Sequence, residues 1–142
     1  MTLRFKSLCS GSKGNATLIQ ASEGRHISHV LVDCGLSLRQ MCLHLQQAGV
    51  EPEQISAIFI THEHADHIGC ARAFALRCRT PVWMSQGTHA ALKQNDFDGL
   101  STMPATSSRW PLVLYNCAPL PCHTMPASRC SCALQMEIKH WV

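Results

Sequence analysis

The chain has 142 residues, which is enough for one domain with a hydrophobic core and too few for two. Hydrophobic residues make up 46% of it and charged residues 15%, a balance typical of soluble globular proteins. No apolar run approaches the roughly 20 residues that cross a membrane, and Met1–Lys6 lacks the pattern of a signal peptide. We therefore expect a cytoplasmic protein without a membrane partner. The net charge of +3 permits an anionic substrate but does not require one.

Nine cysteines are a high and odd number for a chain of this length. In a cytoplasmic protein we expect them to be thiols rather than disulfides. The pairs Cys70/Cys78 and Cys130/Cys132 do not have the spacing of a zinc finger with two pairs of ligands. A zinc site made of cysteines is therefore not expected.

Strands and tight turns are predicted at the start of the chain. The alternation of Leu3–Leu8 predicts a strand, and residues 10–15 form a glycine-rich turn. Ala16–Ala21 and His26–Val32 are two further predicted strands, joined by a hairpin turn at Gly24.

A helix is predicted to begin after Ser37. Ser37 and Gln40 form a capping box, and Gly49 lies where the helix would end. Apolar residues recur on one face of this helix: Leu38, Met41, Cys42 and Leu45. The short, wholly apolar segment Ala57–Ile60 then predicts a buried strand.

Three more predicted elements complete an α/β pattern. A second helical face is made by Ala71, Phe74, Ala75 and Cys78. Pro81–Met84 is a predicted strand and Thr88–Gln94 a predicted short helix. This alternation of strands and helices predicts an α/β layered fold over residues 1–98.

Residues 99–142 have a different composition. Five of the seven prolines and four of the nine cysteines lie beyond Leu100, together with a single acidic residue, Glu137. No sustained period of 2 or 3.6 is present there. We expect an irregular tail that is separate from the domain at 1–98.

Four potential metal ligands stand within six residues: His62, His64, Asp66 and His67. They follow a predicted buried strand and precede a predicted helix, so a rigid strand end and a turn can direct several side chains toward one point. Imidazole and carboxylate groups suit Zn²⁺, and also Mn²⁺ or Fe²⁺. We therefore predict a metal site. The alternatives are a polar loop with chance histidines and, for Asp66, a plain helix N-cap. Glu63 is not expected to be a ligand, because the spacing does not fit an H-E-x-x-H protease.

Three segments resemble those of a known family: Cys9–Asn15 (CSGSKGN), Val32–Gly35 (VDCG) and Thr61–His67 (THEHADH). The H-x-H-x-D-H pattern resembles the signature of the metallo-β-lactamase superfamily. Together the segments resemble its WalJ/YycJ-like branch, whose members are phosphodiesterases and exonucleases that act on DNA. The resemblance covers about the first hundred residues and implies the N-terminal half of a four-layer αββα sandwich, which would be incomplete here.

The resemblance also implies roles for particular residues. His62 and His64 would hold the first of two divalent metal ions, in the first place zinc, and Asp66 and His67 would hold the second. A water or hydroxide between the metals would be the nucleophile, and Asp66 would be catalytic by orienting it. Asp33, at a strand end, would support the ligands from behind, with a strand-end cap as the alternative.

A glycine-rich loop precedes the second predicted strand and could present backbone N–H groups and an ammonium group to a phosphate. It consists of Ser10, Gly11, Ser12, Lys13, Gly14 and Asn15. The alternative is a tight turn that only joins two strands.

The implied function is hydrolysis of DNA or another phosphodiester by a metal-bound hydroxide. One alternative is a thioester or lactam hydrolase of the same fold. Another is a truncated and catalytically inactive remnant, because no motif after His67 resembles the family's remaining ligands. A remnant would expose an apolar sheet face, and we would then expect aggregation.

We interpret the tail as a frameshifted reading of a normal family gene. When the possible codons of Tyr115–Ser131 are regrouped across codon boundaries, they can encode Val-Pro-His-Asp-Ala, which resembles the family's next metal motif. His123 would then lie close to the position of an encoded histidine ligand without being that ligand. Reading the underlying DNA decides this point.

Overall fold

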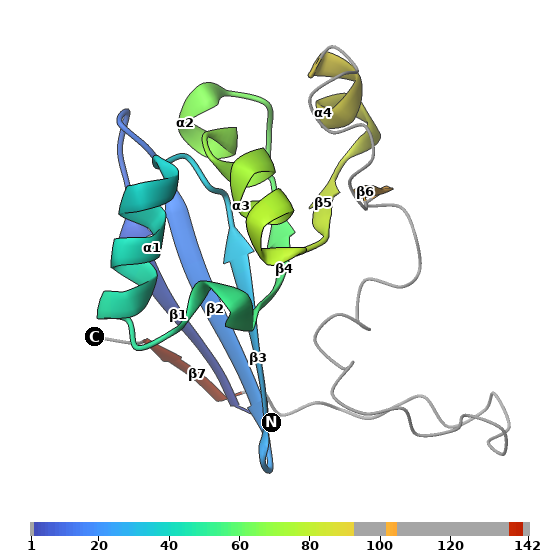
Figure 1. Ribbon diagram of the computed structural model, residues 1–142. Helices are drawn as coiled ribbons and strands as arrows, with labels where there is room; N and C mark the ends of the chain where they lie inside the picture. The colour runs from blue at the N-terminus through green and yellow to red at the C-terminus, as the bar shows by residue number, and fades with distance from the viewer. Residues whose placement is uncertain (1, 93–101, 105–136, 141–142) are drawn as a thin grey trace, which may run out of the picture.

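A computed structural model describes residues 2–92, 102–104 and 137–140. Figure 1 shows a single twisted sheet with helices packed against it, so the predicted α/β character is confirmed. No helix within those ranges is long and apolar enough to span a membrane.

Seven strands form one mixed sheet, in the order β6-β5-β4-β3-β2-β1-β7. They are β1 (Thr2–Cys9), β2 (Ala16–Glu23), β3 (His26–Val32), β4 (Ile55–Phe59), β5 (Val82–Met84), β6 (Thr102–Pro104) and β7 (Glu137–His140). β1, β2 and β3 are antiparallel neighbours, whereas β3, β4, β5 and β6 run parallel. Because parallel strands end at the same edge of a sheet, the segments that follow β3, β4 and β5 lie close together.

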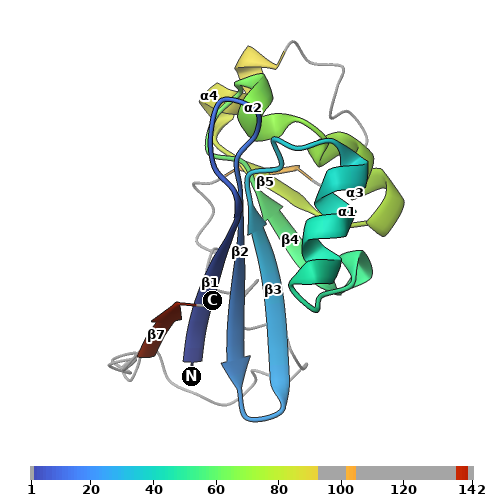
Figure 2. The same cartoon turned by 90° about the vertical axis from the view of Figure 1, so that its left-hand side faces the viewer.

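Five helical segments accompany the sheet where the chain is described: α1 (Leu38–Gln47), the 3₁₀ turn η1 (Pro52–Gln54), α2 (Ala65–Ile68), α3 (Ala71–Cys78) and α4 (Gln86–Ala91). Figure 2 shows α1 and α3 on one face of the sheet. In the same view α2 and α4 lie beyond the upper ends of β3, β4 and β5, so the predicted metal motif is at that edge.

Local sequence signals located most of these elements. The hydroxyl of Ser37 accepts the Gln40 N–H, and the Gln40 side chain returns to the Ser37 backbone, so the predicted capping box of α1 is present. The hairpin between β2 and β3 turns at Gly24, whose φ of 58° lies in the left-handed region that glycine adopts at little cost.

Two elements begin two residues earlier than predicted. β4 begins at Ile55, because this residue already pairs with His29 of β3. α4 begins at Gln86 instead of Thr88, because the hydroxyl of Ser85 accepts the Thr88 N–H at 3.0 Å and caps the helix. The cap at Ser85 was a readable signal that the predicted boundary ignored.

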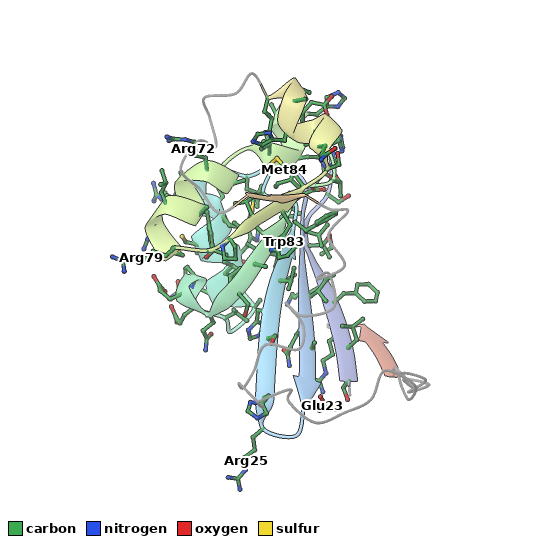
Figure 3. The ribbon with its side chains drawn as sticks, turned by 90° about the vertical axis from the view of Figure 1, so that its right-hand side faces the viewer. Glu23, Arg25, Arg72, Arg79, Trp83 and Met84 are labelled. Atoms are coloured by element: carbon green, nitrogen blue, oxygen red, sulfur yellow. The ribbon has the colours of Figure 1, made fainter. Side chains whose placement is uncertain are left out.

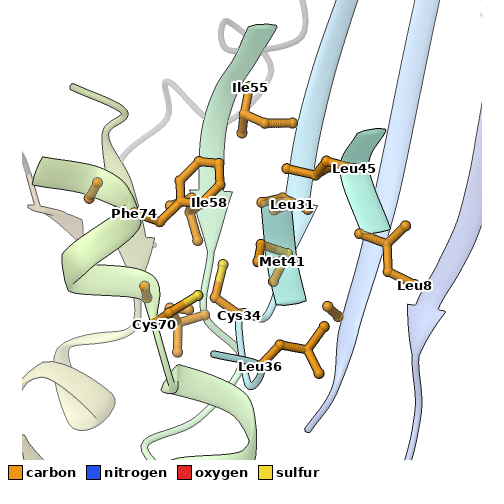
Figure 4. Packing of buried hydrophobic residues seen from close by; sticks show 14 of the residues in the cluster. Leu8, Leu31, Cys34, Leu36, Met41, Leu45, Ile55, Ile58, Cys70 and Phe74 are labelled. Atoms are coloured by element: carbon orange, nitrogen blue, oxygen red, sulfur yellow. The ribbon is translucent and has the colours of Figure 1, made fainter. Parts of the chain in front are cut away.

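The hydrophobic core lies between the sheet and the helices α1 and α3 (Figure 4). Paired residues of four neighbouring strands form a row across this face: Leu18, Leu31, Ile58 and Val82. The helices add the fully buried side chains of Met41, Leu45 and Phe74. Burying side chains of this size stabilises a fold by about 1.5–3 kcal/mol each. The core therefore fixes the position of the edge that carries the metal motif.

The other face of the sheet receives the alternate side chains. Ile19 and Val30 pair across β2 and β3 there and are partly exposed. Trp83 of β5 is buried on this face, whereas the side chains of Glu23 and Arg25 extend from the hairpin at the opposite end of the sheet (Figure 3).

Two short strands, β6 and β7, fall within residues 99–142, and β7 pairs in parallel with β1. The remainder of the expected irregular tail, including Tyr115–Ser131 and His123, lies outside the described residues. The frameshift interpretation therefore remains a prediction.

Candidate metal centre

The candidate centre begins where β3 and β4 end side by side. The Asp33 N–H donates to the Phe59 carbonyl at 2.8 Å, which continues the pairing of the two strands by one residue. The Ile60 N–H likewise donates to the Trp83 carbonyl at 2.8 Å, joining the end of β4 to β5. Residues 61–64 therefore leave the sheet from a backbone that is held on both sides.

The predicted ligands continue into a single turn of helix. α2 has four residues and follows His64, its N-cap, so Asp66 and His67 belong to its first turn. The alternative that Asp66 is a plain N-cap is therefore wrong, because His64 occupies the cap of α2 and Cys70 occupies that of α3.

The four predicted ligands come together in space. The ring centroids of His62 and His67 are 3.8 Å apart, and those of His62 and His64 are 4.8 Å apart. Asp66 Oδ2 lies 3.5 Å from His67 Nε2. The turn after β4 therefore gathers three imidazoles and one carboxylate at the sheet edge.

Asp33 anchors two of these imidazoles. Its buried carboxylate lies 2.8 Å from His67 Nδ1 and also accepts from the Thr61 N–H and hydroxyl, at 2.9 and 3.0 Å. A carboxylate only accepts hydrogen bonds, so His67 Nδ1 carries a proton and donates it, which leaves Nε2 as the ring nitrogen that can face a cation. The hydrogen of the Thr61 hydroxyl goes to Asp33, so the hydroxyl oxygen, 3.0 Å from His62 Nδ1, can only accept from that nitrogen. Asp33 thus holds the start of the turn and contacts His67, while its role behind a bound metal stays a prediction.

The side chain of Asn15 joins the glycine-rich loop to the candidate ligands. Its Nδ2 lies 3.2 Å from both Asp66 Oδ2 and His67 Nε2, and its Oδ1 accepts the Gly11 N–H at 3.0 Å. From the sequence, Asn15 is predicted only as part of a possible phosphate loop. Its place at the end of the motif Cys9–Asn15 was the available signal for this contact.

The loop at 10–15 uses several of its own backbone donors. The N–H groups of Gly11, Gly14 and Asn15 donate to Asn15 Oδ1, to the Gly11 carbonyl and to the Asp66 carbonyl, respectively. Ser10, Ser12 and Lys13 are exposed. These contacts favour the tight-turn alternative for the loop, because three of its amides already have partners within the protein.

Glycines allow three backbone segments to meet behind the centre. A Cβ atom on Gly35 would stand 1.7 Å from the Asp66 carbonyl oxygen, and one on Gly69 would stand 2.6 Å from the Cys34 carbonyl oxygen. A Cβ on Gly14 would meet the Gly35 carbonyl oxygen at 2.7 Å. The sequence motifs do not predict a packing role for these glycines. Gly14 and Gly35 lie within motifs of the resemblance, and Gly69 lies two residues after one.

The donor set fits a divalent cation by its chemistry. Three imidazoles and a carboxylate are suitable ligands for zinc, and the carboxylate–imidazole contact of Asp33 and His67 is the support that metal-bound histidines usually have. In the described ranges, however, no three His, Cys, Asp or Glu side chains are already arranged to hold an ion. The Asn15 amide lies against His67 Nε2 instead, so side chains must turn before they can converge on a cation.

Comparison with known proteins decides the family. The sequence model of the metallo-beta-lactamase superfamily matches residues 10–116, which is well over half of the chain. The chain belongs to the metallo-beta-lactamase superfamily. This membership confirms the resemblance inferred from the H-x-H-x-D-H pattern.

Curated relatives place the chain beside one branch of the superfamily. The exodeoxyribonuclease WalJ of Streptococcus pneumoniae is 31% identical over 96 residues, which cover 68% of this chain and 34% of that protein. The exodeoxyribonuclease YycJ of Bacillus anthracis is 34% identical over 93 residues, which cover 66% and 34%. The predicted WalJ/YycJ-like resemblance is confirmed, and the chain spans about a third of the length of these relatives.

Solved structures of the superfamily agree with the fold. The Rm3 metallo-beta-lactamase matches 62% of this chain and 32% of its own, with a TM-score of 0.51 and 25% identity. A peroxy diiron form of the chemotaxis sensor ODP matches 70% and 39%, with a TM-score of 0.53 and 16% identity, which shows the fold alone. The predicted α/β half of a metallo-β-lactamase fold is therefore confirmed.

Proposed function

We propose that this chain carries part of the active site of a metal-dependent DNA exonuclease. The relatives at 31% and 34% identity are both named exodeoxyribonucleases, and the matched residues include the whole H-x-H-x-D-H motif. The proposed substrate is a phosphodiester bond at a DNA end.

The observation that carries the proposal is the hydrogen-bonded group around Asp33. Its carboxylate keeps the proton on His67 Nδ1, and through the Thr61 hydroxyl it orients His62. Both imidazoles are thereby left with Nε2 as the ligating atom. A polar loop with chance histidines has no need for a buried carboxylate that sets the tautomer of two rings.

In the proposed site His62 and His64 hold one divalent cation, and Asp66 and His67 hold a second. Zinc is the first choice, and manganese or iron are alternatives. Bound divalent cations would polarise the phosphoryl oxygens and bring the pKa of water toward neutrality.

The remaining steps belong to side chains of this chain. Asp33 keeps the imidazole of His67 from rotating, and the amide of Asn15 donates to Asp66 Oδ2 and limits the rotation of that carboxylate. Asp66 is proposed as the catalytic residue, because its second oxygen can accept a hydrogen bond from the attacking water and direct the water lone pair toward phosphorus.

Hydrolysis of a lactam is the second candidate, favoured by the likeness to the Rm3 metallo-beta-lactamase. One set of assays separates the two. The full chain is loaded with zinc or manganese and given linear duplex DNA, closed circular DNA of the same sequence and a chromogenic β-lactam. The matched control is the double variant His62→Ala/His64→Ala.

We expect nucleotides to be released from linear DNA at least tenfold faster than by the double variant, with the closed circle left intact. Turnover of the β-lactam without DNA hydrolysis would replace the exonuclease by the second candidate. Equal release by the wild type and the double variant would mean that the chain is an inactive remnant.

A further inference from the structure

Two buried cysteine side chains touch each other directly behind the candidate metal centre. Cys34 is 0% exposed and Cys70 is 7% exposed, and both are free thiols. The interaction of the two thiols, together with burial, raises the pKa of Cys34 well above its ordinary value, and the same interaction lowers the pKa of Cys70. Figure 4 shows the two side chains side by side between the sheet and α3.

The backbone brings the two residues within the span of a disulfide. The Cys70 N–H donates to the Cys34 carbonyl at 2.9 Å. With standard bond lengths, this contact limits the separation of the two Cα atoms to about 6.8 Å. Disulfides join Cα atoms that are ~4.4–6.8 Å apart, so a bond between these sulfurs needs only a local adjustment.

The same two residues belong to the segments that position the candidate ligands. Cys34 follows Asp33 directly, and its N–H donates to the His67 carbonyl at 2.7 Å. Cys70 stands three residues after His67, and a Cβ on the intervening Gly69 would collide with the Cys34 carbonyl. Any shift of the Cys70 backbone relative to Cys34 therefore also shifts His67 relative to Asp33.

We propose that Cys34 and Cys70 form a reversible disulfide when a hydroperoxide reaches them, and that this bond weakens zinc binding at the adjacent centre. The second half of this statement rests on the proposed function, whereas the first half does not. The disulfide would make the centre responsive to oxidants in a compartment where thiols are otherwise reduced.

The chemistry balances with hydrogen peroxide as the oxidant. The sulfur of Cys70, the more exposed of the two, attacks one peroxide oxygen, the O–O bond breaks, and a sulfenic acid and one water form. The sulfur of Cys34 then attacks the sulfur of Cys70, the S–O bond breaks, and the hydroxyl group leaves with the Cys34 proton as a second water. The two sulfurs lose two electrons in total, and the peroxide gains them.

Bond formation has a geometric consequence for the ligands. A disulfide holds its sulfurs at about 2.05 Å, much closer than two thiols in hydrogen-bond contact. Metal–ligand distances tolerate changes of only about 0.2 Å. The local adjustment that draws Cys70 toward Cys34 exceeds this tolerance as soon as it moves His67 by more than this small amount, and we expect zinc affinity to fall at least tenfold.

The first measurement locates the disulfide. The full chain is treated with hydrogen peroxide, its remaining thiols are alkylated, and it is digested with trypsin and Glu-C. Cleavage after Arg39, Glu63 and Arg72 places Cys34 and Cys70 in separate peptides, neither of which contains Cys42. We expect a peptide pair linked through Cys34 and Cys70 that dithiothreitol separates. Two alkylated peptides without a link, or a link from Cys70 to another cysteine, would overturn the inference.

The second measurement compares zinc affinity in the reduced and oxidised chains, with the variant His62→Ala/His64→Ala giving the background from other thiols. The variant Cys42→Ser is a matched control, because this half-buried thiol lies on α1, where the Arg77 guanidinium is its hydrogen-bond donor at 3.8 Å. We expect Cys42→Ser to keep the tenfold response and Cys70→Ala to lose it.

The outcomes separate the two parts of the inference. Equal zinc affinity in the two redox states would refute the effect on the centre while leaving the disulfide in place. A reduced wild-type chain that binds no more zinc than the double variant would refute the proposed function and this effect together. The linked peptide decides the thiol chemistry in either case.

Discussion

The three histidines of the candidate centre differ in their hydrogen-bond support. We call His62 and His67 the inner histidines and His64 the outer histidine. His62 and His67 are both connected to the buried carboxylate of Asp33, one through Thr61 and the other directly. His64 is exposed, and its imidazole meets the edge of the His62 ring without a hydrogen-bond partner in the described part of the chain. The motif itself gives these residues equal weight, so their support depends on segments distant in sequence.

The difference teaches that the support of His62 and His67 comes from the contact between α2 and the segment that follows β3. Asp33 and Gly35 follow β3, and they meet the backbone and side chains of residues 66 and 67. Four substitutions test this view. Some disturb the contact of residues 33–35 with residues 66 and 67, and the others leave that contact in place.

The largest expected effect is that of Gly35→Ala. The new Cβ would lie 1.7 Å from the Asp66 carbonyl oxygen, so the two segments must separate. We expect the free energy of unfolding to fall by about 3 kcal/mol, the upper range of overpacking effects. Urea unfolding measures it, and Gly87→Ala is the control, because the nearest atom to its Cβ is Ser85 Oγ at 3.8 Å. A loss no larger than that of Gly87→Ala would contradict the tight junction.

Asp33→Asn should weaken the hydrogen-bond support of the inner histidines, so that they resemble His64. The new amide can still accept the Thr61 N–H, but its NH₂ group cannot accept from His67 Nδ1. We expect zinc affinity to fall about 10- to 100-fold, as for other partners of metal-bound histidines. The control Glu63→Gln changes the charge equally beside the motif and should alter affinity less than about threefold by the same reasoning. Similar losses for the two variants would mean that charge alone, and not the anchoring of His67, controls binding.

Asn15→Ala should separate support of the fold from support of the ligands. The variant removes the hydrogen bonds that join the loop to Asp66, and we expect a loss of about 1.5 kcal/mol in the free energy of unfolding. Zinc affinity should fall less than in Asp33→Asn, because the variant loses only the contact that limits the rotation of Asp66, whereas a cation would displace the contact of Asn15 with His67 Nε2 in any case. Thermal unfolding with a parallel zinc titration checks both; a loss of affinity as large as that of Asp33→Asn would contradict the assignment.

Ser37→Ala tests whether stability and the centre are independent. This residue caps α1 on the helical face, outside the group of ligands. Removing the cap should lower the free energy of unfolding by about 1 kcal/mol. Zinc affinity should stay at the wild-type value, and a parallel fall in affinity would mean that any loss of stability disturbs the centre.

Sequence patterns predicted the elements that have strong local signals. The capping box placed the start of α1, and the alternation of residues 3–8, 16–21 and 26–32 placed three strands. The spacing of His62, His64, Asp66 and His67 identified the family, which comparison with known proteins then confirmed. Local hydrogen-bond geometry and side-chain periodicity are encoded over a few residues, so one sequence suffices to read them.

The contacts that hold the centre could not be predicted in the same way. Asn15 and Asp66 are 51 residues apart, and Asp33 and His67 are 34 apart, so their contacts depend on the pairing of β3 with β4. The short helix α2 was missed because its four residues are too few for any periodic pattern. The touching thiols of Cys34 and Cys70 were not expected, because nothing near either residue indicates the other.

Metal content is the most direct test of the claim that residues 62–67 hold a divalent cation. The full chain would be incubated with zinc, passed over a desalting column to remove loosely bound metal and measured by elemental analysis beside His62→Ala/His64→Ala/His67→Ala. We predict at least one zinc ion per wild-type chain beyond what the triple variant retains. Equal zinc content in the two proteins would contradict a cation site at residues 62–67.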